Sequence, residues 1–211
     1  MPVFFQQQIN EYTRLGVWKI EETEEFFKGN VPQHRQVTHP HKRLQHLAGR
    51  FLLQYLFPDF PYELVQIADT RKPFLPDEQY HFSISHCADY AAAIVSRHSR
   101  VGIDVEIPVE KILAIQDKFM TTAENDEWNK TNLAEADSHQ AIQTRATLCW
   151  SCKEAVFKWY GNGAVDFKKH IVLLNHEPAA EMIGCSFTKT DTALSIHYRR
   201  FEGLVLAWVV S

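Results

Sequence analysis

The sequence predicts an α+β protein in which small antiparallel sheets pack on long helices. Apolar residues recur at helical spacing in two long stretches, and several shorter stretches alternate apolar and polar residues as strands do. In each part of the chain, a pair of alternating stretches follows a long amphipathic helix. A chain of 211 residues can form one large domain or two small ones.

The first part of the chain is predicted to contain one long helix and two pairs of strands. The expected elements are strands over residues 3–8 and 14–20, a helix from 41 to 56, and a hairpin that joins 81–85 to 90–95. Residues 96–100 form a polar break. We therefore expect two α+β domains, residues 1–99 and 100–211.

The second part is predicted to follow a similar order. The expected elements are a strand over residues 101–106, a helix entered at 121–124, a polar loop over 132–139, a helix through 149–160, and a closing hairpin of 193–198 with 203–210. Ser83-Ile-Ser-His86 has a weak echo in Ser195-Ile-His197 of the closing hairpin. Two equivalent halves would explain this echo.

The strand over residues 101–106 carries two carboxylates. Side chains on a strand point to opposite faces in turn, so Asp104 and Glu106 share one face and the apolar residues share the other. Mg²⁺ usually takes one or two carboxylates together with phosphate oxygens, so this pair is a candidate magnesium site. The alternative is an ordinary half-buried strand whose polar face meets water.

The helix through residues 149–160 carries a second pair of charged residues. Glu154 and Lys158 lie one turn apart, and the helix stops at Gly161, a residue typical of left-handed C-terminal caps. In a functional site, Glu154 would be a third acidic ligand or a base, and Lys158 a phosphate partner or an acid. The alternative is an exposed ion pair worth roughly 0.2–0.5 kcal/mol.

His86 ends an alternating run just before a turn. A polar side chain at the end of a strand can reach a ligand, although a structural histidine is the alternative.

These segments together resemble the 4′-phosphopantetheinyl transferases, and specifically the long surfactin-synthetase type. The family pattern is a Ser-His strand, then Gly-Ile-Asp-Val/Ile-Glu, then Trp-x-x-Lys-Glu-x-x-x-Lys. This chain matches at Ser85-His86, at 102–106 and at 150–158, and Lys72-Pro73 also fits. It departs at Cys87, where the family often has Ser, and at Gln45, where many relatives have Arg.

The resemblance implies two similar halves related by a pseudo-two-fold axis, with the active site in the cleft between them. It implies Mg²⁺ held by Asp104, Glu106 and Glu154, with Glu154 and Lys158 as the catalytic residues. With nearby cations in place of the missing Arg, the residues expected to bind coenzyme A are Lys42, Arg43, Lys72, Pro73, Ser85, His86 and Lys153.

The implied reaction transfers 4′-phosphopantetheine from coenzyme A to a serine of an apo acyl, peptidyl or polyketide carrier protein. It releases 3′,5′-adenosine bisphosphate. A Mg²⁺-dependent nucleotide or coenzyme A pyrophosphatase would use the same carboxylates with water as nucleophile. A non-catalytic relative that binds carrier proteins or coenzyme A is a third hypothesis, although every charged position of the three motifs is filled.

Composition narrows the remaining possibilities. A formal net charge of −4 disfavours a nucleic-acid binder, which would carry a basic stripe. No apolar run approaches the roughly 20 residues of a membrane span, and the first residues do not form a secretion signal. We therefore expect a cytoplasmic protein with no membrane partner, and the resemblance to the surfactin-synthetase type implies a monomer. Cys149 and Cys152 lie within a helix, which favours buried thiols over a zinc or redox site.

Overall fold

The computed structural model describes residues 3–32, 36–131 and 138–211, and it contains two large antiparallel sheets. The first sheet has the strand order β1-β2-β6-β5, the second has the order β7-β11-β10-β9-β8, and β3 pairs with β4 in a small ribbon. The strands are β1 (Val3–Asn10), β2 (Thr13–Lys19), β3 (Gln66–Ile67), β4 (Pro73–Phe74), β5 (His81–Cys87), β6 (Tyr90–Ser96), β7 (Val101–Glu106), β8 (Ile171–Glu177), β9 (Met182–Phe187), β10 (Thr192–Phe201) and β11 (Leu204–Val210).

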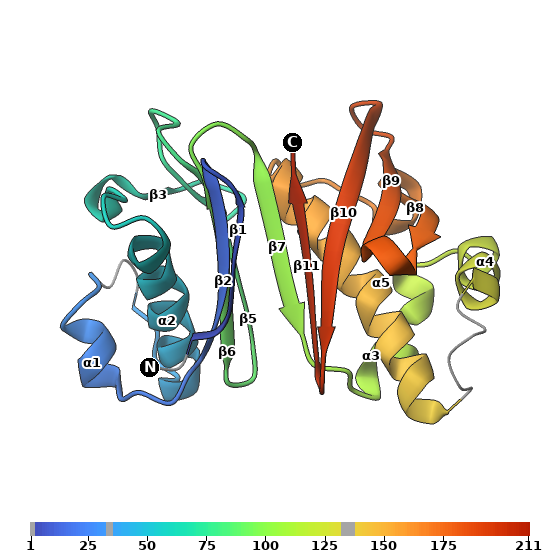
Figure 1. Cartoon of the computed structure of the whole chain (residues 1–211), viewed down its shortest axis with the longest axis horizontal. Coiled ribbons are helices and arrows are strands. Elements are labelled where there is room, and N and C mark those ends of the chain that lie inside the picture. The colour runs from blue at the N-terminus through green and yellow to red at the C-terminus, as the bar shows by residue number, and fades with distance from the viewer. Residues whose placement is uncertain (1–2, 33–35, 132–137) are drawn as a thin grey trace.

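Two long helices, α2 and α5, lie outside the two sheets (Figure 1). The helices are α1 (Glu24–Lys28), α2 (Pro40–Leu56), α3 (Lys111–Ala114), α4 (Thr122–Thr131), α5 (His139–Tyr160) and α6 (Phe167–His170), with 3₁₀ turns at Tyr62–Leu64, Gln116–Lys118 and Pro178–Ala180. The structure therefore confirms the α+β class and its antiparallel sheets.

Strand alternation explains why the two sheets pack against each other. On β6, Ala93 and Val95 join the apolar cluster beneath α2, whereas Ala92 and Ile94 join a separate cluster between the sheets. Leu206 of the second sheet belongs to that shared cluster. Each sheet thus buries both faces, one against its helix and the other against its neighbour.

The sheets also meet at their edges, because β5 and β7 are each the last strand of a sheet. An edge strand leaves backbone N–H groups without a ladder partner. The Ser83 and Ser85 hydroxyls accept hydrogen bonds from the N–H groups of Ile103 (3.2 Å) and Val105 (3.3 Å). The Ser-x-Ser pattern of β5 therefore connects it to β7.

Helix α5 approaches β7 closely at Gly102. A Cβ atom at that position would lie 2.0 Å from the Ala155 carbonyl oxygen and 2.6 Å from the Trp159 nitrogen. Only glycine allows this contact without a backbone shift. The contact holds the helix face bearing Glu154 and Lys158 against the strand bearing Asp104.

Several sequence expectations are confirmed and others need correction. The two N-terminal strands, the helix beginning near residue 41, both hairpins and the 101–106 strand are present. Helix α5 begins at His139, so the loop expected over 132–139 ends earlier, and its residues 132–137 lie outside the described residues. Helix α1 and strands β8 and β9 were not anticipated.

Two compositional expectations can also be compared with the structure. Cys149 and Cys152 are free and fully buried. None of the helices formed by the described residues is long and apolar enough to cross a membrane.

Candidate active site

The site is built where β7 faces the last turns of α5. Asp104 is only 2% exposed, and it lies on the β7 face that Gly102 presents to the helix. Lys158 reaches it from α5, with its Nζ atom 2.6 Å from Asp104 Oδ1. The structure thus brings Asp104 of β7 and Lys158 of α5 together, and Asp104 is buried rather than exposed to water.

Ser85 completes a three-residue polar link across the two sheets. Its hydroxyl donates to Asp104 Oδ1 at 2.8 Å and accepts from Lys158 Nζ at 2.8 Å. Charge-assisted hydrogen bonds of this kind are stronger than neutral ones. The link joins β5, β7 and α5 at a single point.

The positive charge of Lys158 interacts with three carboxylates, those of Asp104, Glu106 and Glu154. Burial and the Asp104 charge raise the pKa of Glu154 to about 7, and Lys158 partly offsets this shift. Burial and Asp104 likewise raise the pKa of Glu106. The carboxylates therefore destabilise each other's charged forms, as expected for like charges in a partly buried site.

The donor set is suited to a hard cation. Asp104 Oδ2 is buried and has no hydrogen-bond partner among the described residues, although its carboxylate is charged and paired through Oδ1. Oxygen ligands of this kind suit Mg²⁺. Within the described part of the chain, however, no three His, Cys, Asp or Glu side chains stand close enough to hold an ion as they are placed. Asp104 is meanwhile neutralised by Lys158.

A basic cavity of about 220 Å³ opens on the opposite face of β5. His86 lines it together with His46 and Arg50 of α2 and Arg71 of the β3–β4 ribbon. The sequence analysis did not single out His46 or Arg50. Their spacing of four residues on one helix face was the signal that could have identified them.

A second cavity, of about 330 Å³, extends from the basic one toward the carboxylates. Arg71, Pro73 and Ile84 line both cavities, and Lys158 lines the second. The two cavities therefore adjoin and form a groove that runs from the α2 cations to Lys158.

The expected coenzyme A residues near the start of α2 have different surroundings. Arg43 forms two 2.7 Å hydrogen bonds with the Glu24 carboxylate and also donates to the carbonyl oxygens of Val37 and Thr38, so it ties α1 to α2. Lys42 is exposed and does not line the groove. Gln45, at the position where relatives often have Arg, donates to the Ala88 carbonyl oxygen at 2.7 Å.

Lys72 lines the groove but also caps α5. Its Nζ atom donates to the Lys158 carbonyl oxygen at 2.7 Å. Gly161 makes this possible, because it has a φ of 74° and any Cβ there would lie 2.5 Å from the Lys72 ammonium. Positive φ and the close side chain both favour glycine at this position.

The structure gives Lys153 a structural role rather than the expected contact with coenzyme A. Lys153 is fully buried, and its Nζ atom donates to the carbonyl oxygens of Phe119 and Phe167 and to the Glu124 carboxylate at 2.8 Å. All three ammonium protons are therefore used inside the protein. The motif position was visible in the sequence, but the partners were not.

Comparison with known proteins now identifies the family. A sequence model described as the 4′-phosphopantetheinyl transferase superfamily matches residues 100–209, about half of the chain. The chain belongs to this superfamily, which confirms the resemblance at that level.

Curated relatives agree with this assignment. Enterobactin synthase component D of Escherichia coli K12 is 35% identical over 133 residues, which cover 61% of this chain and 60% of the relative. The protein of that name from Salmonella typhimurium is 30% identical over 57% of this chain and 49% of the relative. A putative 4′-phosphopantetheinyl transferase of Haemophilus influenzae is 32% identical over 46% of this chain and 40% of the relative. The chain thus spans no more than 60% of the length of these relatives.

Replacing Lys153 tests its structural role. Lys153→Met should lower the free energy of unfolding by about 3–5 kcal/mol, because it leaves the Glu124 carboxylate without its buried cation. Lys168→Met, which removes an exposed lysine, should change it by no more than about 0.5 kcal/mol. Urea unfolding of both variants measures the difference. Unchanged stability of Lys153→Met together with weaker coenzyme A binding would contradict the structural assignment.

Proposed function

We propose that this protein transfers 4′-phosphopantetheine from coenzyme A to a serine of an apo carrier protein. The observation that carries the proposal is the Asp104–Lys158 ion pair, which lies beside two further carboxylates and at the end of a cation-lined groove. Superfamily membership supports the reaction class. The name of one relative, a putative 4′-phosphopantetheinyl transferase, supports the same reaction class.

The groove offers a path for coenzyme A. Its basic end, with Arg50 and His86, suits the 3′-phosphate, and Pro73 with Ile84 provides an apolar floor toward Lys158. The pyrophosphate would then lie beside the carboxylates. Asp104, Glu106 and Glu154 would hold Mg²⁺, which when bound neutralises phosphate oxygens and orients the bond to be broken.

The residues of the chain have separate tasks in this reaction. The serine oxygen forms a bond to the phosphorus that carries pantetheine, and the phosphorus–oxygen bond to 3′,5′-adenosine bisphosphate breaks. Glu154 accepts the serine proton. Lys158 stabilises or protonates the departing phosphate oxygen. Each proton transfer of this kind contributes ~10²–10⁴-fold in rate.

We also propose that the two sheets represent two similar halves of a single-chain, surfactin-synthetase-type enzyme that works as a monomer. Each sheet is covered by one long helix, and residues 99 and 100 precede β7, the first strand of the second sheet. The division into residues 1–99 and 100–211 and an active site at the junction agree with the Ser85 link between β5 and β7.

The transfer itself can be tested by intact mass. The protein is incubated with coenzyme A, Mg²⁺ and a panel of apo carriers, and we expect at least one carrier to gain one phosphopantetheine. Asp104→Asn, Glu154→Gln and Lys158→Ala should each slow the gain by roughly 100-fold or more. Glu110→Gln, which changes an exposed carboxylate beyond β7, should retain activity. Coenzyme A cleavage with no carrier modified would support a pyrophosphatase instead.

We expect the basic cavity to bind the 3′-phosphate of coenzyme A. Arg50→Gln and His86→Gln should each raise the KM for coenzyme A by about ten-fold with a smaller change in kcat, because they remove binding shared by ground and transition states. The same variants should discriminate less between coenzyme A and dephospho-coenzyme A. Lys42→Gln, outside the cavity, should behave as wild type. Equal discrimination in all four proteins would place the 3′-phosphate elsewhere.

A further inference from the structure

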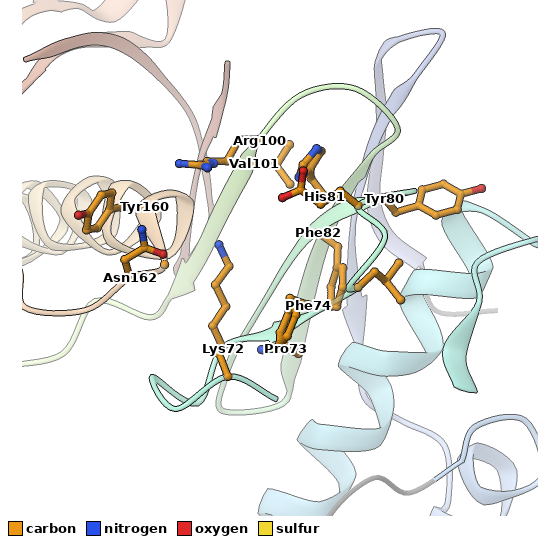
Figure 2. A pocket seen from close by; sticks show the side chains of 14 residues that line it. Lys72, Pro73, Phe74, Tyr80, His81, Phe82, Arg100, Val101, Tyr160 and Asn162 are labelled. Atoms are coloured by element: carbon orange, nitrogen blue, oxygen red, sulfur yellow. The ribbon is translucent and has the colours of Figure 1, made fainter. Parts of the chain in front are cut away.

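A third cavity, of about 260 Å³, has no task in the proposed reaction. It lies between the β4–β5 segment and the C-terminal end of α5 (Figure 2). This cavity adjoins the groove, because both are lined by Lys72, Pro73, Phe82 and Gly161. Lys158, Asp104 and Glu154 do not line it.

The cavity collects positive charge. Lys72, Arg100 and His81 line it, and Figure 2 shows the Lys72 side chain extending toward Arg100. Burial and then the Arg100 charge lower the pKa of Lys72 to about 8. Burial also lowers the pKa of His81, and the charges of Arg100 and Lys72 add to that shift. Among the described residues, Glu78 is the one acidic residue that lines the cavity, and no carboxylate forms an ion pair with Lys72 or Arg100.

The walls between these cations are aromatic. Phe74, Phe82 and Tyr160 line the cavity, and Phe74 is 37% exposed. Asn162 adds an amide at the α5 side (Figure 2). Aromatic walls with a few converging polar groups are typical of small-molecule sites, and the volume is below the ~300–1,000 Å³ of sites for drug-sized ligands.

We propose that this cavity binds a small organic anion, a carboxylate or phosphate carried on a planar ring, separately from coenzyme A. Arg100 and Lys72 pair with the anionic group, and the ring packs against Phe74 and Tyr160. A guanidinium suits both carboxylate and phosphate oxygens because it presents parallel N–H donors.

An anion bound in this cavity is connected to the active site through residues that hydrogen-bond to the end of α5. Lys72 donates to the carbonyl oxygen of Lys158, and Thr70 of the same ribbon connection donates to that of Gly161 at 3.0 Å. A ligand held by Lys72 therefore bears on the end of the helix that carries Lys158.

Direct binding tests the proposal without any transfer assay. Calorimetric titrations use benzoate and phenyl phosphate as probes, with benzamide and inorganic phosphate as the neutral-ring and ring-free controls. We expect one-to-one, saturable binding of at least one aryl anion and markedly weaker binding of both controls. Arg100→Gln should lower the affinity for the aryl anion by about ten-fold or more, because it removes a charge-assisted hydrogen bond.

The matched control is Arg97→Gln, which removes an exposed arginine that does not line the cavity, and it should leave the affinity within about two-fold of wild type. No saturable binding of either probe in the millimolar range, or equal binding to wild type and Arg100→Gln, would overturn the proposal. With coenzyme A already saturating, the titration should still show one-to-one, saturable binding of the aryl anion. Competition by coenzyme A would assign the probes to the groove and would also overturn it, whatever the outcome for transfer.

Discussion

The buried link between Lys158, Asp104 and Ser85 is the interaction on which the rest of the molecule depends. A carboxylate that is 2% exposed is tolerated only when it is paired, because an unpaired buried charge costs several kcal/mol. The link joins three elements, β5, β7 and α5, so it requires both sheets and α5 to be in place. Charges needed for the proposed chemistry therefore also fix how the two sheets meet at β5 and β7.

The packing around this link holds α5 in the position that the link requires. Gly102 lets α5 approach β7, and the Lys72 ammonium and Gly161 fix the end of that helix from the other side. The carboxylates and Lys158 are thus held between a close backbone contact and a capped helix end. The backbone positions of these residues are therefore fixed, which favours electrostatic stabilisation of the transition state. Their side chains must still move closer together to hold an ion, because no three His, Cys, Asp or Glu side chains of the described residues are close enough as they are placed.

The sequence predicted those parts that depend on local periodicity. Alternation placed Asp104 and Glu106 on one strand face, and helical spacing placed Glu154 beside Lys158. The sequence could not predict the hydrogen-bond partners of Lys153, because these partners lie 34, 29 and 14 positions away along the chain. Strand β8 was missed because Leu174 is exposed and the register shifts between Leu173 and His176, which breaks the simple alternation. Strand β9 does alternate buried and partly exposed residues, so its pattern could have been recognised. His46 and Arg50 face the groove only because α2 packs across β5.

The central proposal is that the carboxylates beside Lys158, whose one ion pair among the described residues is Asp104–Lys158, bind Mg²⁺ as a second positive charge. Thermal unfolding in MgCl₂, against NaCl at matched ionic strength, tests this claim without relying on catalysis. The account predicts a saturable rise in the unfolding midpoint of the wild type, equivalent to ~2.7 kcal/mol at one hundred times the dissociation constant. It predicts little or no rise for Glu106→Gln, which removes one proposed ligand but keeps the Asp104–Lys158 pair. The account would be contradicted if Mg²⁺ left the unfolding midpoint of the wild type unchanged, or if it raised the midpoint of Glu106→Gln by the same amount.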